Sequence, residues 1–292
     1  MKVLIGYDGS MCADAALADL RKTGLPADTE ALVVSVGETW LPPPSSYEML
    51  ETDFAHGRDR TLRDAEELAV AGRDKVLASF PQWATRHEAR VGSPARQLLA
   101  LADEWKPDLI VVGSYGRTGI AKFFLGSVSQ TVASEASCSV RIARGHIDVP
   151  DEPVRIVVGL DGSRGADAAV RAVEGRVWPT GSHARLITAI GPFSIDGREL
   201  KGELERVQEL HSSALQRLRS KGLEVTTTIH EADPRKFIVE NAEQWGADCI
   251  FVGASGLLTI DRFLFGTVAA AVTARASCSV EVVRERVSGV HT

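Results

Sequence analysis

The sequence repeats itself, and this internal repeat limits the fold more than any other feature does. The segment VLIGYDGSMCADAAL at residues 3–17 reappears as IVVGLDGSRGADAAV at residues 156–170, a shift of 153. A longer segment at residues 109–140 reappears at residues 249–280, a shift of 140. Self-similarity at such spacing indicates a duplicated structural unit. We therefore predict two domains of the same fold, and a chain of 292 residues gives each enough length to bury its own core.

The two shifts differ because the first copy carries about 13 more residues between the matched segments. We place this surplus at residues 38–50, where three successive prolines suit neither a helix nor a central strand and predict an exposed loop. The boundary between the copies falls near residues 145–153, which lose apolar periodicity and hold two prolines. The predicted domains are residues 1–145 and 153–286, joined by a linker at 146–152.

Short apolar runs alternate with segments of helical period in each copy. Helices are expected from about Ser10, over residues 59–80, from Pro94 and from Ser127. The expected strands of the first copy are residues 2–7, 31–36, 86–91, 108–113 and 138–143. Strands rich in Val and Ile without polar alternation are typical of parallel sheets covered on both faces. The predicted fold class is α/β, with two tandem doubly wound domains, each a five-stranded parallel sheet with helices on both faces.

Composition excludes several classes of protein. With 33 Lys and Arg against 39 Asp and Glu, the chain lacks the positive charge of a nucleic-acid binder. No run approaches the ~20 apolar residues of a membrane span, and the first residues already belong to a strand, so we expect a cytoplasmic protein without membrane contact. The four cysteines show no metal-binding spacing and are expected to be buried free thiols, and the seven histidines are scattered singly, so no metal site is expected.

A glycine motif follows the fourth strand of each copy. In the first copy Gly113 and Gly116 are followed, after nine residues, by Gly126 and Ser127. The first two glycines leave a strand, a place that favours positive φ and lets the backbone approach a ligand closely. The last two residues open a helix whose free N–H groups suit an anion. The alternative is that the glycines and hydroxyls serve packing and capping alone. The matching residues of the second copy are Gly253, Gly256, Gly266 and Thr267.

A second motif, Asp-Gly-Ser, follows the first strand of each copy at residues 8–10 and 161–163. Ser10 and Ser163 are predicted to cap the helices that follow. Asp8 and Asp161 have two interpretations. Either carboxylate can bond the backbone two residues on as part of a turn, or it can accept from a base or ribose and hold Mg²⁺ through water. We favour contact with a ligand.

Together the two motifs resemble the nucleotide-binding branch of the universal stress protein family, and the resemblance covers nearly the whole chain twice. It implies sheets of strand order 3-2-1-4-5 and an adenine nucleotide, ATP or ADP or AMP, between strands one and four. Asp8 and the backbone of Val36 would then meet the adenine, and Gly113 the ribose. The phosphate contacts would come from Gly116, Gly126, Ser127 and Ser129. In the second copy the implied residues are Asp161, Ile190, Gly253, Gly256, Gly266 and Thr267, with Ala269 in place of Ser129.

The two copies differ in ways that predict unequal sites. Arg117, which could pair with a phosphate, is matched by Leu257, and the hydroxyl of Ser129 has no counterpart. Asp233, in the segment that matches Gly92-Ser93-Pro94, would add negative charge if it lay near the second site. We therefore expect the first site to bind more tightly.

The chain lacks the Gly-x4-Gly-Lys-Ser/Thr run that places a lysine on a γ-phosphate, so efficient ATP hydrolysis is not expected. The expected function is a stress-response regulator that signals nucleotide state by ordering the loops at residues 114–125 and 254–265. The alternatives are a weak ATPase or nucleotidyl-transferring enzyme, and a nucleotide-free assembly module. The resemblance also implies that the last strands of the two copies pair, which would make one chain a pseudo-dimer and leave a homodimer of chains open.

Overall fold

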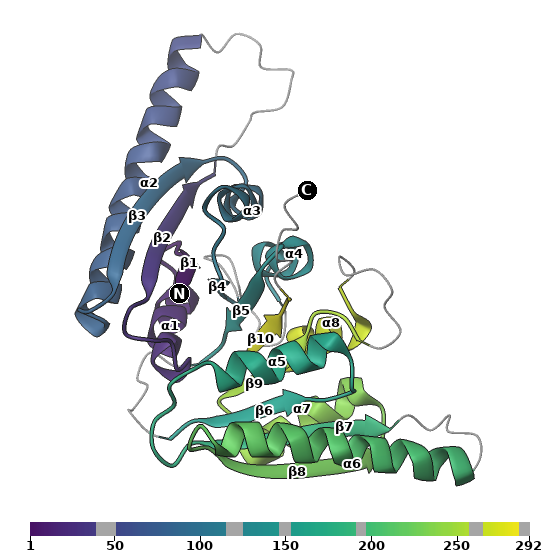
Figure 1. Cartoon of the computed structure of the whole chain (residues 1–292). Helices are drawn as coiled ribbons and strands as arrows, with labels where there is room; N and C mark the ends of the chain where they lie inside the picture. Colours follow the sequence, from purple (N-terminus) through teal and green to yellow (C-terminus); the bar gives the residue numbers. More distant parts are fainter. Residues whose placement is uncertain (39–50, 115–124, 146–152, 191–196, 257–264, 286–292) are drawn as a thin grey trace, which may run out of the picture.

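The strands of both halves join into one continuous sheet (Figure 1). This computed structural model describes residues 1–38, 51–114, 125–145, 153–190, 197–256 and 265–285. Within these residues the strand order is β3-β2-β1-β4-β5-β10-β9-β6-β7-β8. Each half therefore has the order 3-2-1-4-5, as predicted, and its own strands are parallel. Of the predicted loop at residues 38–50 the structure describes only Glu38, and the predicted linker at residues 146–152 lies outside the described residues.

Strands and helices alternate along each half, as the sequence predicts. The first half comprises β1 (Lys2–Gly6), α1 (Met11–Asp19), a short 3-10 helix (Leu20–Lys22), β2 (Glu30–Gly37), α2 (Glu51–Ser79), β3 (Ala84–Val91), α3 (Pro94–Trp105), β4 (Leu109–Gly113), α4 (Ser127–Glu135) and β5 (Ser139–Ala143). The second half comprises β6 (Arg155–Gly159), α5 (Arg164–Glu174), β7 (His183–Ile190), α6 (Gly197–Arg219), β8 (Glu224–Glu231), α7 (Pro234–Trp245), β9 (Cys249–Gly253), α8 (Thr267–Arg275) and β10 (Ser279–Val283).

Helix α2 begins eight residues earlier than the predicted start at residue 59. The prediction rested on apolar periodicity, and residues 51–58 (ETDFAHGR) carry no regular apolar spacing. The starts of α1, α3 and α4 agree with the sequence because each is marked by a local signal, a serine N-cap, a proline at the first helical position or a glycine-serine pair.

Both faces of the sheet are covered in each half, which gives two apolar cores per half. In the first half, α1 and α2 pack on one face and α3 and α4 on the other. The second half repeats this arrangement with α5 and α6 opposite α7 and α8. The central strands are buried over most of their length, as expected for parallel strands with helices on each side.

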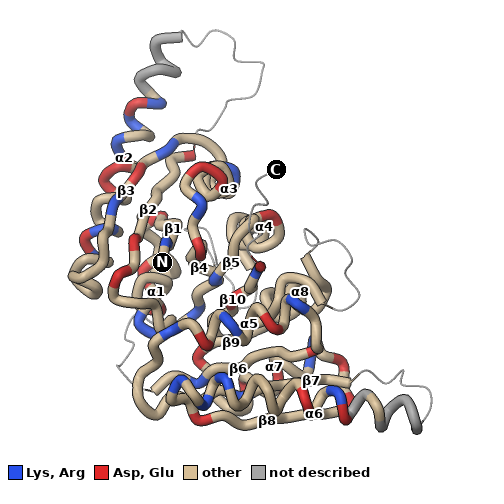
Figure 2. The backbone as a smooth tube through the Cα atoms, in the orientation of Figure 1, with Lys and Arg blue, Asp and Glu red and all other residues tan. Residues whose placement is uncertain are grey.

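The halves meet where β5 pairs with β10, and this pairing is antiparallel. The predicted pairing of the last strands is thereby confirmed, and one chain forms an intramolecular pseudo-dimer. Acidic and basic residues are interspersed along both halves (Figure 2). In the part of the chain that the structure describes, no helix has the length and apolar character needed to cross a membrane.

Candidate functional site

The two sequence motifs of each half meet at the carboxyl ends of its first and fourth strands. In the first half β1 lies between β2 and β4, so the strand order reverses between β1 and β4. In the second half the same reversal falls between β6 and β9. Open α/β sheets bind ligands at this reversal, because the loops after the two strands diverge to opposite faces and leave a crevice. The structure therefore contains two equivalent candidate sites.

The Asp-Gly-Ser segment forms a tight turn into helix α1. The Oδ1 atom of Asp8 accepts a hydrogen bond from the Ser10 N–H at 3.0 Å. Gly9 has φ +75°, a left-handed conformation that favours glycine. The Ser10 hydroxyl oxygen accepts from the Ala13 N–H at 3.1 Å, which confirms the predicted N-cap. The second half repeats the turn with Asp161 and Ser163 (2.9 Å), Gly162 (φ +80°), and Ser163 and Ala166 (3.1 Å).

The turn uses only the Oδ1 atom of each aspartate as a hydrogen-bond acceptor, and Oδ2 takes no part in it. The interpretation as a turn residue is thus observed for Asp8 and Asp161, and it is compatible with ligand contact through Oδ2. In the second half, a Cβ atom built on Gly256 would lie 3.0 Å from Asp161 Oδ2. The carboxylate therefore faces the backbone at the start of the glycine loop, and the two motifs of the second half are brought together.

Gly113 and Gly253 are required by helix packing rather than by backbone conformation. The expectation of positive φ at this strand end is wrong for both residues, which end β4 and β9 in extended conformation. A Cβ atom on Gly113 would lie 2.8 Å from the carbonyl oxygen of Cys12 in α1. On Gly253 it would lie 2.4 Å from the carbonyl carbon of Gly165 in α5. The close approach is thus between two backbones of the protein, which draws the first helix onto the fourth strand.

Helices α4 and α8 begin beside this strand end, and none of the described side chains caps either one. Gly126 is the N-cap of α4, and its own N–H donates to the Ser114 carbonyl at 2.8 Å. Gly266 does the same with the Ala254 carbonyl at 2.7 Å. The next N–H groups belong to the first turn, where an α-helix offers donors and positive potential. Ser127 and Thr267, the first helical residues, are exposed.

Ser129 was predicted to contact the phosphates, and in the structure its hydroxyl bonds the backbone of β4. The residue is 4% exposed, and its hydroxyl donates to the Gly113 carbonyl at 2.6 Å. This bond joins the first turn of α4 to the end of β4. The corresponding residue Ala269 has no hydroxyl, so the second half lacks the bond. Ser129 therefore positions the helix, and its single hydroxyl proton is already in use.

The other predicted site residues have different outcomes. Gly116 and Arg117 lie outside the described residues, as do residues 115–124 and 257–264 of the two predicted loops. Val36 lies near the end of β2 and is partly buried against the core under α3 and α4. The strand register aligns Val36 with Ala189, because Val34 pairs with Gly6 as Ile187 pairs with Gly159. Ile190, predicted as the match of Val36, is therefore one residue too far along β7.

Asp233 does not add a free negative charge. It is the N-cap of α7, and its carboxylate accepts from the Arg235 backbone at 2.9 Å and from the Arg235 guanidinium at 2.7 Å. The side-chain hydrogen bond from Arg235 lowers the pKa of Asp233 to about 2. Because Arg235 balances this negative charge, Asp233 gives no reason to expect weaker ligand binding at the second site.

Three further glycines, Gly9, Gly162 and Gly165, have structural roles that the sequence motifs did not predict. The first two were visible as the invariant centre of the repeated Asp-Gly-Ser segment, which is a common turn composition. Gly165 gave no local signal, because it is a glycine inside a helix whose need for a small residue comes from a strand almost 90 residues away.

Comparison with known proteins agrees with the duplicated architecture. The model of the Universal stress protein family matches residues 1–144 and again residues 154–284. A universal stress protein of Mycobacterium tuberculosis is 26% identical over 300 residues, which cover 97% of each chain. One from Synechocystis is 41% identical over 149 residues, 49% of this chain and 97% of its own. The crystal structure of a universal stress protein from Archaeoglobus fulgidus has the same fold, with a TM-score of 0.67 at 22% identity, covering 97% of this chain and 98% of that one.

Proposed function

Because this chain belongs to the universal stress protein family in both halves, we propose that it binds adenine nucleotide at two sites, one per half, and acts as a nucleotide-dependent regulator. Each site lies at the carboxyl ends of the first and fourth strands. The ligand we propose is ATP, with ADP or AMP as alternatives of the same chemistry. Mg²⁺ would accompany the phosphates through water molecules held by the aspartates.

The observation that carries the proposal is the pair of uncapped helix N-termini. The first helix of each half has one of its N-terminal N–H groups bonded to a serine hydroxyl, that of Ser10 in α1 and of Ser163 in α5. The last helix of each half has glycine at the N-cap and an exposed hydroxyl residue next, and no described side chain accepts a hydrogen bond from the N–H groups of its first turn. Free backbone N–H groups and the positive end of the helix dipole favour a phosphate at this position.

The remaining groups suit the rest of a nucleotide. Asp8 and Asp161 each present a carboxylate whose Oδ1 is held by the turn, which leaves Oδ2 as an acceptor for a base or ribose. We assign the adenine to Asp8 and the backbone of Val36, and the ribose to the end of β4 at Gly113. The phosphates are assigned to Gly116, Arg117, Gly126 and Ser127, with Ser129 holding α4 in place. In the second half we assign Asp161, Ala189, Gly253, Gly256, Gly266 and Thr267 to the same roles.

A regulatory role fits these groups better than rapid catalysis. No residue of the proposed sites matches the lysine that P-loop enzymes place on the γ-phosphate. Nucleotide occupancy would instead act through the backbone of the segments that contact the phosphates. We propose that residues 114–125 and 254–265 become ordered around the bound nucleotide and present that state to partners.

Calorimetric titration of the full chain with ATP, ADP and AMP tests the proposal. We expect two binding events, with the first half tighter because Arg117 is replaced by Leu257. Asp8→Asn keeps the acceptor of the turn and removes the carboxylate, so it should weaken only the first event without lowering thermal stability. Asp161→Asn is the matched variant for the second event. Absence of binding by any of the three nucleotides at millimolar concentration would refute the proposal, and equal affinities would refute the assigned asymmetry.

A further inference from the structure

The junction between the halves has a buried ion pair at its centre. The antiparallel register of β5 and β10 sets Arg141 opposite Glu281, with Val140 and Ile142 opposite Val282 and Val280. Arg141 and Glu281 occupy the same position in the two copies of the repeat, whose local shift is 140. The pseudo-twofold axis that relates the halves therefore passes between these two side chains. At this axis a residue of one half meets its own counterpart.

Both central side chains are buried. Arg141 is 0% exposed and Glu281 is 1% exposed, and Arg141 Nη1 lies 3.5 Å from Glu281 Oε2. Burial alone would lower the pKa of Arg141, but the nearby carboxylates of Asp19 and Glu281 raise it, so the guanidinium is charged. A charged group in such a place is stable only when it is paired and hydrogen-bonded.

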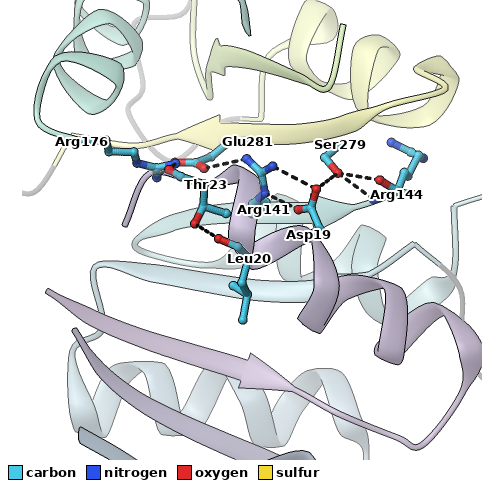
Figure 3. A network of polar contacts seen from close by, with 8 residues as sticks. All are labelled: Asp19, Leu20, Thr23, Arg141, Arg144, Arg176, Ser279 and Glu281. Atoms are coloured by element: carbon cyan, nitrogen blue, oxygen red, sulfur yellow. Dashed lines mark hydrogen bonds and ion pairs between the residues drawn. The ribbon is translucent and has the colours of Figure 1, made fainter. Parts of the chain in front are cut away.

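Each half supplies an additional partner for its own central charge (Figure 3). Asp19 accepts from Arg141 Nε at 2.6 Å within the first half, and Arg176 forms an ion pair with Glu281 within the second. These partners come from different positions of the repeat. Asp19 is aligned with Ala172, and Arg176 is aligned with Thr23. The two halves thus carry ion pairs of opposite polarity, built from non-equivalent residues.

Further bonds connect the two pairs across the junction. The Ser279 hydroxyl of the second half donates to Asp19 Oδ1 at 2.8 Å. The Arg176 guanidinium donates to the Thr23 carbonyl of the first half at 2.9 Å. The network is therefore continuous from one half to the other and includes both central charges (Figure 3).

Other contacts across the junction follow the pseudo-twofold symmetry, because equivalent residues of the two halves form them. The Arg144 guanidinium donates to the Thr273 carbonyl at 2.5 Å, and its counterpart Arg284 donates to the Ala133 carbonyl at 2.6 Å. Each arginine thus meets the carboxyl end of the other half's last helix, where a cation is favoured. Two identical halves would form the same contacts, so these arginines cannot decide which edges pair.

We propose that the reversed polarity at the axis makes the edges of β5 and β10 specific for each other. Two first halves would bring Arg141 against Arg141, and two second halves would bring Glu281 against Glu281, in a site closed to water. Like charges in such a site disfavour the wrong partner, which is how interfaces acquire specificity. The first half therefore accepts the edge of a second half and rejects another first half. Copies of the chain can associate through this surface only by exchanging opposite halves.

Exchanging the residues that form the two ion pairs between the halves tests this proposal in the full chain. Asp19→Ala, Thr23→Arg and Arg141→Glu together give the first half the residues of the second. Ala172→Asp, Arg176→Thr and Glu281→Arg together do the reverse. Each triple variant retains an ion pair inside every half and places like charges across the axis. The sextuple variant exchanges both sets and restores opposite charges.

We expect each triple variant to lose about 5–10 °C in Tm, and the sextuple variant to recover most of that loss. Independent additive losses in the sextuple variant would overturn the proposal, as would triple variants with the Tm of the wild type. Mixing provides a second measurement, since one triple variant has two acidic edges and the other two basic edges. Light scattering after chromatography should detect a mixed species with equal amounts of both chains. Triple variants that associate with themselves as readily as with each other would contradict the proposed specificity.

Discussion

Ser127→Asp should raise the stability of the free protein and weaken nucleotide binding at the first site. Ser127 is the first residue of α4, is exposed and follows a glycine N-cap without a side-chain acceptor. A carboxylate at this position remains in contact with water and interacts favourably with the helix dipole. The same carboxylate stands where we place the phosphates. The two effects therefore have opposite signs, which a merely disruptive substitution would not produce.

The expected sizes follow from the charge and its exposure. An exposed acid in the first turn of a helix stabilises it by about 0.3–1 kcal/mol. A phosphate charge about 5 Å from the new carboxylate is repelled by roughly 1–3 kcal/mol at effective dielectric constants of about 20–60. That repulsion corresponds to roughly 5- to 150-fold weaker binding. Salt screens both effects, so the loss of affinity should shrink as ionic strength rises toward 1 M.

Calorimetric titration with ATP measures the affinity, and thermal unfolding without nucleotide measures the stability. Ser127→Asn is the matched control, because it has the size of the aspartate without its charge. Thr267→Asp and Thr267→Asn are the corresponding pair for the second site. If Ser127→Asp binds nucleotide as well as Ser127→Asn does, the phosphate does not lie at the start of α4. If it lowers the Tm, the first turn is not available to an anion in the free protein.

Two further predictions concern stability. His211 is 4% exposed, its Nε2 lies 2.7 Å from the Thr188 hydroxyl, and burial lowers its pKa. The unfolded chain therefore binds a proton near pH 6.5 at a histidine that the folded chain keeps neutral, so the free energy of unfolding should decrease as the pH falls below that value. The decrease should be less steep in His211→Ala. Urea unfolding at several pH values measures it, and the same dependence on pH in both proteins would refute this prediction. Gly253→Ala should lower the free energy of unfolding by ~1–3 kcal/mol, because the new Cβ would meet the backbone of Gly165. Gly57→Ala, in α2 with open space around it, should raise it by up to ~1 kcal/mol. Thermal unfolding measures both, and similar changes for the two variants would contradict the packing argument.

Much of the candidate site follows from short segments of sequence. The N-caps Ser10 and Ser163 and the starts of α3 and α4 were predicted because capping depends on residues three or four positions apart. Residue-by-residue assignment was less successful where it required exact alignment of strands. A one-residue error put Ile190 in place of Ala189, and the pairing of β6 with β7 corrects that register.

Periodicity and repeat spacing can be read along the chain, so they predict the duplicated unit, the α/β class and the location of the motifs at strand ends. Tertiary structure alone decided what those residues contact. Gly113 must be glycine because α1 crosses the end of β4, and Ser129 is bound to the carbonyl of that glycine. Arg141 and Glu281 stand out as single charges in their apolar strands, yet they meet across a sequence separation of 140 only because the chain folds into two halves. Contacts at such separation arise from packing, and no local pattern specifies them.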